Sequence, residues 1–192
     1  MLSIIAGRIA MARDIWATSD THFQHGNILN FTLPNGNFVR PEFSCVEEMD
    51  ETIIQNWNSV VKKGDLVYHL GDVFMGDKET FCKLWPRLNG KKRLVIGNHD
   101  DVIYMSRGGF FSKITESRIF KEFGIVFTHR PMHVRGLLTL YDKRGTYPDD
   151  AEYMTNVHGH IHAHNSPEGP YRNICVEKTN YTPVNIEDLR TR

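Results

Sequence analysis

The sequence predicts a layered α/β domain, and two observations lead to this prediction. Strand-like apolar runs alternate with helix-like segments in the first half of the chain, whereas the second half is rich in strand-like runs. In addition, five apolar runs end directly in Asp, Asn or His. Ligands of open α/β sheets bind in the crevice outside the carboxyl ends of the strands, so these polar ends mark the expected site.

The strands are expected where short apolar runs are bounded by polar and turn-forming residues. One such run is the segment 66–70, Leu-Val-Tyr-His-Leu, which leads into Gly71 and Asp72. By the same criterion, strands are expected over 14–19, 66–70, 93–96, 114–121, 125–128, 155–158 and 172–177.

The helices are expected where apolar residues recur every three or four positions. This spacing predicts an amphipathic helix over 45–61, and Ser44 with Glu47 has the spacing of a capping box at its start. A short helix is expected over 78–85, and a terminal turn or helix over 186–190.

The composition is that of an ordinary globular protein and suits one domain over 1–192. Lys plus Arg and Asp plus Glu each number 23, so the net charge of zero gives no general attraction to nucleic acid. No segment has the roughly 20 apolar residues that a membrane span needs. We expect residues 1–12 to form a loose extension rather than a signal peptide, because the short run 2–6 has no preceding Lys or Arg.

The cysteines carry no metal or disulfide pattern. Cys45, Cys82 and Cys175 are odd in number and far apart in the sequence, and none forms a CxxC pair. A reducing, cytoplasmic compartment is the simplest expectation from this usage.

The polar residues at the strand ends are the candidate metal ligands. A single Asp or His after a strand is usually a turn, cap or packed residue, but here two carboxylates, four imidazoles and one amide occur together. This set without thiolates suits Mn, Fe, Zn or Ni. Seven ligands exceed one tetrahedral site, but with a bridging carboxylate they can serve two ions. Two ions about 3.5–4 Å apart can activate water and hold the oxygens of a phosphoryl displacement. The candidates are Asp20, His22, Asp72, Asn98, His129, His160 and His162.

The spacing within the motifs also favours convergence. Asp20 with His22, and His160 with His162, lie two positions apart, so on an extended segment both side chains of a pair point to the same side. A glycine that permits a tight turn or close backbone approach precedes three of the candidates, at Gly71, Gly97 and Gly159.

These motifs resemble, in the same order, the five signature motifs of the calcineurin-like metallophosphoesterases. They read SDTH at 19–22, GD at 71–72, GNHD at 97–100, TH at 128–129 and GHIH at 159–162. GNHD and GHIH together are the specific part of the resemblance. The segments SDTHFQHGN, VEEMDETIIQNWNSVV, YHLGDV and NYTPVN further resemble the small single-domain branch of bacteria and phages.

The resemblance implies a four-layer αββα sandwich of two mixed sheets flanked by helices. It also implies two divalent transition-metal ions, with Mn²⁺ the foremost candidate and Fe, Zn or Ni as alternatives. By this resemblance, Asp20, His22 and His162 hold the first ion. Asn98, His129 and His160 hold the second, and Asp72 bridges the two. His99 is no ligand; it faces the scissile phosphate and protonates the leaving oxygen or stabilises the transition state.

The sequence departs from the protein-phosphatase branch of this family in one motif. That branch continues its GD motif as GDxxDRG, which supplies an Asp partner for the catalytic His and a phosphate-binding Arg. Here residues 71–76 read GDVFMG, so both are absent. A phosphoprotein substrate is therefore less expected, and the sequence identifies no partner for His99.

The expected function is a phosphodiesterase acting on a small nucleotide-like substrate. A phosphomonoesterase, a nuclease and a non-catalytic scaffold of the same fold are the alternatives. Arg130 and Arg135 can contact phosphate, and His25 can face the site, although each can equally be a surface residue. His69 is expected to be a packed histidine and His158 at most a residue behind the ligands.

Two loops, 30–41 and 136–150, are expected to border the site. They carry Phe31, Phe38, Tyr141 and Tyr147, which can stack on a base or simply pack the loops onto the domain.

Overall fold

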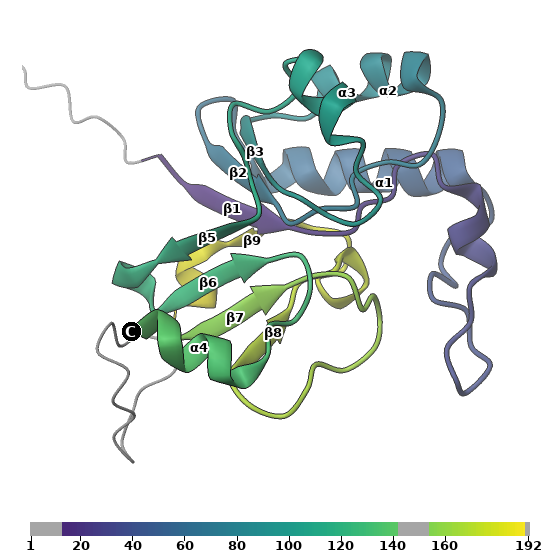
Figure 1. The fold of residues 1–192 in the computed structure, drawn as a ribbon. Helices are drawn as coiled ribbons and strands as arrows, with labels where there is room; N and C mark the ends of the chain where they lie inside the picture. Colours follow the sequence, from purple (N-terminus) through teal and green to yellow (C-terminus); the bar gives the residue numbers. More distant parts are fainter. Residues whose placement is uncertain (1–12, 142–153, 191–192) are drawn as a thin grey trace, which may run out of the picture.

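The computed structural model describes residues 13–141 and 154–190. The extension expected at 1–12 lies outside these residues, as does Tyr147. The described chain folds into two sheets that pack face to face, with helices on their outer sides (Figure 1).

The first sheet holds five strands in the order β4-β3-β2-β1-β9. Three of its four strand pairings are parallel, and the fourth pairs β9 antiparallel to β1. In the register, Ala17 lies opposite Tyr68, and Tyr68 lies opposite Arg93. The strands are β1 (Ile15–Thr18), β2 (Leu66–His69), β3 (Lys91–Val95), β4 (Ile114–Thr115) and β9 (Val184–Asn185).

The second sheet holds four strands in the order β5-β6-β7-β8. β5 is antiparallel to β6, whereas β6, β7 and β8 are parallel, so this sheet is also mixed. The strands are β5 (Ser117–Phe120), β6 (Ile125–Thr128), β7 (Thr155–His158) and β8 (Tyr171–Asn173).

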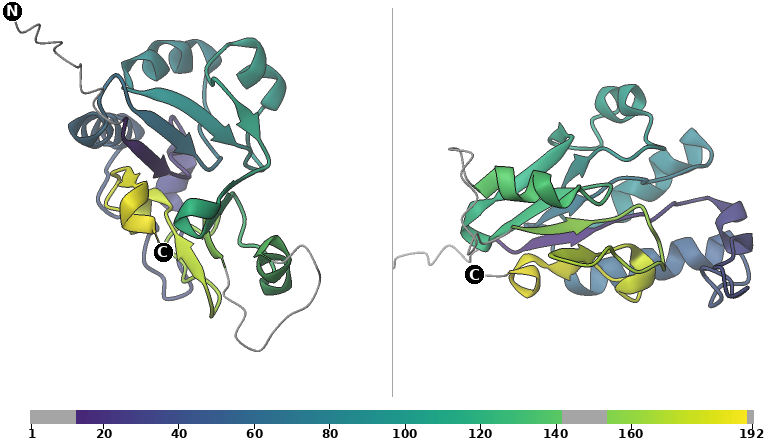
Figure 2. Two further views of the ribbon diagram at one scale, coloured as in Figure 1. Left: turned by 90° about the vertical axis from the view of Figure 1, so that its left-hand side faces the viewer. Right: turned by 60° about the horizontal axis from the view of Figure 1, so that its bottom comes forward.

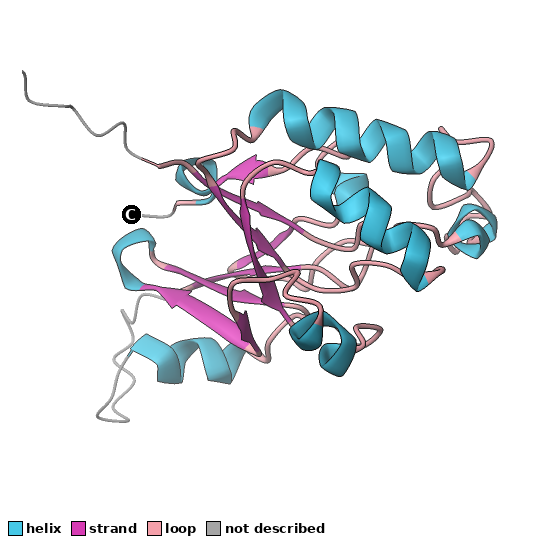
Figure 3. Ribbon diagram, turned by 90° about the horizontal axis from the view of Figure 1, so that it is seen from above, coloured by secondary structure: helices cyan, strands magenta, loops and turns pink. Residues whose placement is uncertain are grey.

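Helices cover both outer faces (Figures 2 and 3). α1 (Val46–Val60), α2 (Lys78–Leu84) and α3 (Val102–Arg107) lie over the first sheet, and α4 (Val134–Tyr141) lies over the second. α5 (Ile186–Leu189) follows β9. Short 3-10 turns complete the chain: η1 (Gly26–Asn30), η2 (Trp85–Arg87), η3 (Lys121–Phe123) and η4 (Val176–Lys178).

The alternation of side chains along the strands creates the four layers. Ile125 and Phe127 of β6 join the core between the two sheets, whereas Val126 points the other way and packs with Leu137 of α4. In β2, Tyr68 faces the same inter-sheet core, and Val67 packs with the residues beneath α1 and α2. The expected αββα sandwich of two mixed sheets is therefore confirmed.

Three expectations about the elements need correction. The strand expected over 114–121 is two strands in different sheets, because the chain crosses from one sheet to the other at Glu116. The strand expected over 172–177 ends at Asn173, and the chain then turns into η4. The capping box is also wrong: the side chain of Ser44 pairs with Glu48 rather than Glu47, and Cys45 is the N-cap residue.

Several elements were not expected from the sequence. Helix α3 follows the GNHD motif directly, and strand β9 has only two residues, too few for an apolar pattern. Residues 134–141 form α4, so the first part of the expected loop 136–150 is helical and the rest lies outside the described residues. None of the described helices is both long and apolar enough to cross a membrane. All three cysteines are free thiols, as expected.

Candidate metal centre

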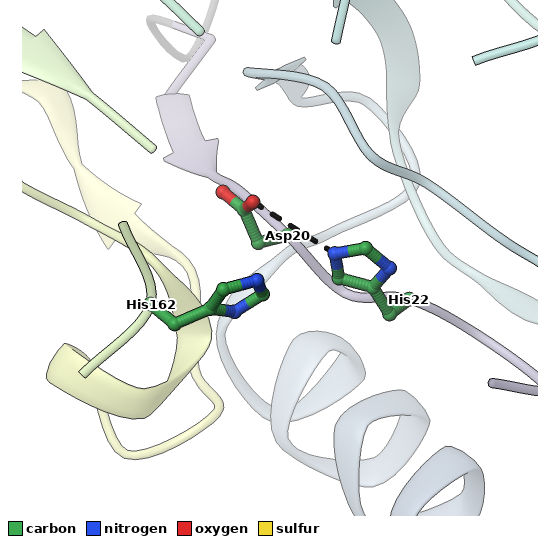
Figure 4. A group of neighbouring side chains, drawn as sticks. All are labelled: Asp20, His22 and His162. Atoms are coloured by element: carbon green, nitrogen blue, oxygen red, sulfur yellow. Dashed lines mark ion pairs between the residues drawn. The ribbon is translucent and has the colours of Figure 1, made fainter. Parts of the chain in front are cut away.

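Six of the seven candidate ligands fall into two groups at the carboxyl ends of the strands. In the first group, ligand atoms of Asp20, His22 and His162 lie within 4.8 Å of one another. Figure 4 shows Asp20 and His22 on the segment after β1, with His162 approaching from a separate segment. The second group, within the same limit, contains Asp72, His129 and His160. Each group therefore combines residues that follow strands of both sheets.

Asp72 belongs to the second group but also lies close to the first. Its Oδ2 is 3.6 Å from Nε2 of His22 and 3.5 Å from Nε2 of His129. The other oxygen, Oδ1, accepts a hydrogen bond of 2.9 Å from the backbone N–H of His99. One carboxylate oxygen thus faces a ligand of each group, which is the place that a bridging ligand requires.

Asn98, the seventh candidate, joins the second group through His129. Nδ1 of His129 lies 2.7 Å from the carbonyl oxygen of Leu70, which can only accept, so Nδ1 carries a proton. In a neutral ring Nε2 then presents a lone pair toward Oδ1 of Asn98, 2.9 Å away. Two acceptors at this distance repel each other, whereas a shared cation is bound by both.

The buried polar atoms fit a cation in the first group as well. Oδ2 of Asp20 accepts hydrogen bonds from the backbone N–H of His160, the hydroxyl of Ser19 and the thiol of Cys175. Oδ1 of Asp20 and both ring nitrogens of His22 are buried without a hydrogen-bond partner. Such groups are costly to bury unless something binds them, and nitrogen and carboxylate oxygen are good donors to a divalent transition metal.

The pKa shifts of His22 and His160 favour the neutral ring that metal binding needs, whereas those of His162 and Asp20 favour the protonated form. Burial, followed by the positive charge of neighbouring groups such as His162, lowers the pKa of His22 far below its ordinary value. Burial also lowers the pKa of His160 to about 4. Burial acts in the same direction on His162, but the hydrogen bond and charge of Glu177 outweigh it and raise its pKa. The pKa of the Asp20 carboxyl is raised, chiefly by burial.

The backbone of the ligand turns is left-handed rather than extended. φ is 57° at Asp20 and 48° at His22, and 69° at His160 and 49° at His162. The expectation that these pairs converge because they lie on extended segments is therefore wrong in its reason. Convergence comes instead from turns in a backbone region that residues other than glycine seldom adopt.

Hydrogen bonds hold the first two ligand turns together. Thr21 donates its hydroxyl proton to the carbonyl of Val73, and His69 donates from Nε2 to that hydroxyl over 2.9 Å. Nδ1 of His69 then accepts from the N–H of Gly71. Burial keeps this ring neutral by lowering its pKa to about 3. The expectation that His69 is packed and hydrogen-bonded is thus confirmed.

Asp100 has the same role between the second and third turns, which the sequence did not indicate. Its carboxylate accepts from the backbone N–H groups of Asp72, Val73 and Gly97 at 2.8–3.1 Å. Its place in the GNHD motif was the only signal.

All three motif glycines are required by close approach, as expected. A Cβ on Gly71, whose φ is +96°, would collide with the backbone of Gly97. A Cβ on Gly97 would collide with the backbone and carboxylate of Asp72. A Cβ on Gly159 would collide with the side chains of Ser19 and Asp20. Any larger residue would push the turns apart.

His99 lies at the edge of the site. Its ring is exposed and stands edge-on to His22, with 5.9 Å between ring centroids. Across residues 13–141 and 154–190, no side chain or backbone group hydrogen-bonds this ring. The neighbouring Asp100 points inward and does not replace the missing Asp partner.

The structure also reveals Arg40 and Glu177, which the sequence analysis missed. Both are buried, and they form an ion pair of 2.8 Å. Oε1 of Glu177 also accepts from Nδ1 of His162 over 3.0 Å. Burial alone would raise the pKa of Glu177. The charge of Arg40 and the hydrogen bond from His162 together outweigh burial, so the net shift of this pKa is downward. No motif pointed to either residue, because they are 137 positions apart.

Four further residues were singled out from the sequence: His25, Arg130, Arg135 and His158. His25 and Arg130 lie beside candidate ligands. The half-buried ring of His25 is 5.2 Å from that of His22 and 5.6 Å from that of Phe31. Arg130 lines an open hollow of about 470 Å³ together with Asn98, His129 and Glu116. His158 is buried, and its ring hydrogen-bonds the carbonyl oxygen of Gly159 and the hydroxyl of Ser166. Arg135 is exposed on α4.

Comparisons with known proteins identify the family of this chain. The model of the calcineurin-like phosphoesterase family matches residues 13–174. An uncharacterized protein of Methanocaldococcus jannaschii is 32% identical over 189 residues, covering 91% of this chain and 88% of the relative. The gene 66 protein of Mycobacterium phage L5 is 30% identical over 137 residues, or 70% of this chain and 59% of the phage protein.

A solved structure has the same fold. It is that of a protein of unknown function from Aquifex aeolicus, with a TM-score of 0.67 and 27% identity, and the match covers 92% of this chain and 97% of the other. The chain therefore belongs to the calcineurin-like phosphoesterase family, and its relatives fit the small single-domain branch that the motifs indicated.

Proposed function

We propose that this protein is a metal-dependent phosphodiesterase that hydrolyses a small nucleotide-like substrate. The observation that carries this proposal is the pair of ligand groups with the Asp72 carboxylate between them. Two adjacent divalent sites are suited to in-line phosphoryl displacement.

The candidate ligands would divide into two sets, one for each ion. Asp20, His22 and His162 would hold one ion, and Asn98, His129 and His160 the other. Asp72 would contact both and offset part of their charge. Two such ions supply Lewis-acid stabilisation of the phosphoryl oxygens and lower the pKa of a nearby water. The donor set of imidazole, carboxylate and amide oxygen favours Mn²⁺, with Fe, Zn or Ni as alternatives.

His99 would act on the leaving group. Its ring is exposed beside His22 but is not in either ligand group, so it is free to meet a bound substrate. A protonated imidazole there can donate its proton to the leaving oxygen as the ester bond breaks.

The surroundings favour a small diester over a phosphoprotein or duplex DNA. The hollow beside Asn98 and His129 offers room for the second ester group of a diester. Arg130, which also lines it, can contact the phosphate of the substrate. Phe31 and Phe38 are 44% and 51% exposed, so part of each side chain is accessible and can stack on a base. A net charge of zero gives no long-range attraction to a polyanionic duplex, which disfavours a nuclease.

The first prediction concerns metal content. The purified protein is expected to bind two ions per chain and to be most active with Mn²⁺, because seven nitrogen and oxygen ligands converge. Elemental analysis and activity before and after chelation measure this. Full activity of a metal-free sample contradicts the proposal, and a chain that binds no metal is the outcome expected of a non-catalytic scaffold.

The second prediction concerns the bridge. Asp72→Asn is expected to lower metal occupancy and turnover more than His160→Asn does, since Asp72 faces a ligand of each group. Metal content and turnover of the two variants are compared at equal metal supply. Normal occupancy and turnover in Asp72→Asn remove the bridging role.

The third prediction concerns His99. His99→Gln is expected to keep both metals and lose turnover by roughly 10²–10⁴-fold for a poor leaving group, because the proton donor is gone. The loss is expected to be small for a nitrophenolate leaving group, which needs little protonation. His133→Gln, an exposed histidine outside both groups, is the control. Equal losses for both leaving groups argue against proton donation.

The fourth prediction concerns the substrate. kcat/KM is expected to be higher for bis-nitrophenyl phosphate than for nitrophenyl phosphate with the same metal, because the chain lacks the second Asp and the Arg of the GDxxDRG motif, which would clamp a dianionic monoester. Dinucleotides and cyclic nucleotides are then compared. A strong preference for the monoester or for a phosphorylated peptide overturns the substrate assignment and leaves the metal site intact.

A further inference from the structure

Arg40 and Glu177 form a charged pair in the interior, behind the first ligand group. Arg40 is the largest polar side chain with no exposed surface, and the Glu177 side chain is 3% exposed. Nε and Nη2 of Arg40 both lie 2.8 Å from Oε1 of Glu177. A buried ion pair is weak evidence for stability, because desolvation of both charges offsets much of their attraction. The contacts of the pair therefore indicate its role better than its energy does.

Arg40 holds the turn that carries Asp20 and His22. Its Nη2 donates to the carbonyl oxygen of Asp20 over 2.6 Å, and its Nη1 donates to the carbonyl oxygen of Thr21 over 3.0 Å. The guanidinium is planar and has five donors in fixed directions, so it can bind these two carbonyls and a carboxylate at once.

Glu177 contacts His162, the ligand of the first group that follows a strand of the second sheet. Its Oε1 lies 3.0 Å from Nδ1 of His162. Since an ionised carboxylate only accepts, Nδ1 carries the proton and Nε2 keeps its lone pair for a metal. Oε1 of Glu177 thus accepts hydrogen bonds from both His162 and Arg40. Through Arg40, His162 is linked to the turn that carries Asp20 and His22.

The second group is oriented differently. Nδ1 of His129 donates to the backbone carbonyl of Leu70, and no side-chain carboxylate takes part in that contact. A change at Glu177 therefore reaches the first group directly and leaves the orientation of His129 intact.

We propose that Arg40 and Glu177 are positioning residues for the first metal: Glu177 fixes the tautomer and direction of His162, and Arg40 fixes the turn of Asp20 and His22 against it. This inference rests on the proposed two-metal site. It predicts that the two metals depend on Glu177 unequally.

The test is Glu177→Gln, which keeps the shape of the side chain and removes its charge. Apo protein is titrated with Mn²⁺ by calorimetry, and the spin coupling of the bound ions is followed by electron paramagnetic resonance. Loss of a partner behind a ligating His typically weakens metal affinity by about 10–100-fold. We expect that loss at one site only, with an uncoupled Mn²⁺ signal when the metal is limiting.

The matched control is Glu51→Gln, which removes the carboxylate of an exposed ion pair between Glu51 of α1 and Arg87 of η2. It is expected to bind both ions as the unaltered protein does. Thermal unfolding of each apo variant separates positioning from folding. Glu177→Asp keeps the charge but shortens the side chain, so it is expected to lie between the two, and it serves as the test variant if Glu177→Gln does not fold.

Four outcomes of these measurements are distinguishable. Unequal weakening of the two sites supports the positioning role. Equal weakening of both sites, or unchanged metal binding with a lower unfolding temperature, overturns it while leaving the two-metal site in place. Absence of Mn²⁺ binding by the unaltered protein contradicts the proposed function itself.

Discussion

The arrangement of the site depends on how the carboxylate of Asp20 divides its two oxygens. Oδ2 accepts the backbone N–H of His160, so it ties the turn after β1 of the first sheet to the turn after β7 of the second. Oδ1 stays buried without a hydrogen-bond partner, available to a cation. This contact requires the two turns to touch, which is possible only because Gly159 has no Cβ to strike Ser19 and Asp20.

The turns that meet there are stabilised by the protein and not only by a ligand. Left-handed φ values at non-glycine residues cost on the order of 1–3 kcal/mol each, and they persist only where the surroundings impose them. Here the hydrogen bonds of His69, Thr21 and Asp100 to neighbouring turns supply that restraint. The ligands are consequently held near their positions in advance, which reduces the rearrangement that metal binding requires.

The candidate ligands could be predicted from the sequence because each sits in a short motif at the end of an apolar run. The reason for their convergence could not, because left-handed backbone at Asp20 or His162 leaves no mark in the residue pattern. Arg40 and Glu177 could not be predicted as a buried pair for a different reason. In the sequence each resembles an ordinary surface charge, and only the fold brings the two together. Similarly, the single run 114–121 gives no sign that the chain changes sheets at Glu116.

The origin of the ligands has a consequence for the whole domain. Each ligand group draws on both sheets, so an ion in either group acts as a cross-link between the two halves of the sandwich. A ligand that binds only the folded state adds about 2.7 kcal/mol of stability at a free concentration 100 times its dissociation constant. If both groups hold ions, the stability of the fold would depend on the metal supply, and metal removal would favour separation of the sheets and exposure of the core between them.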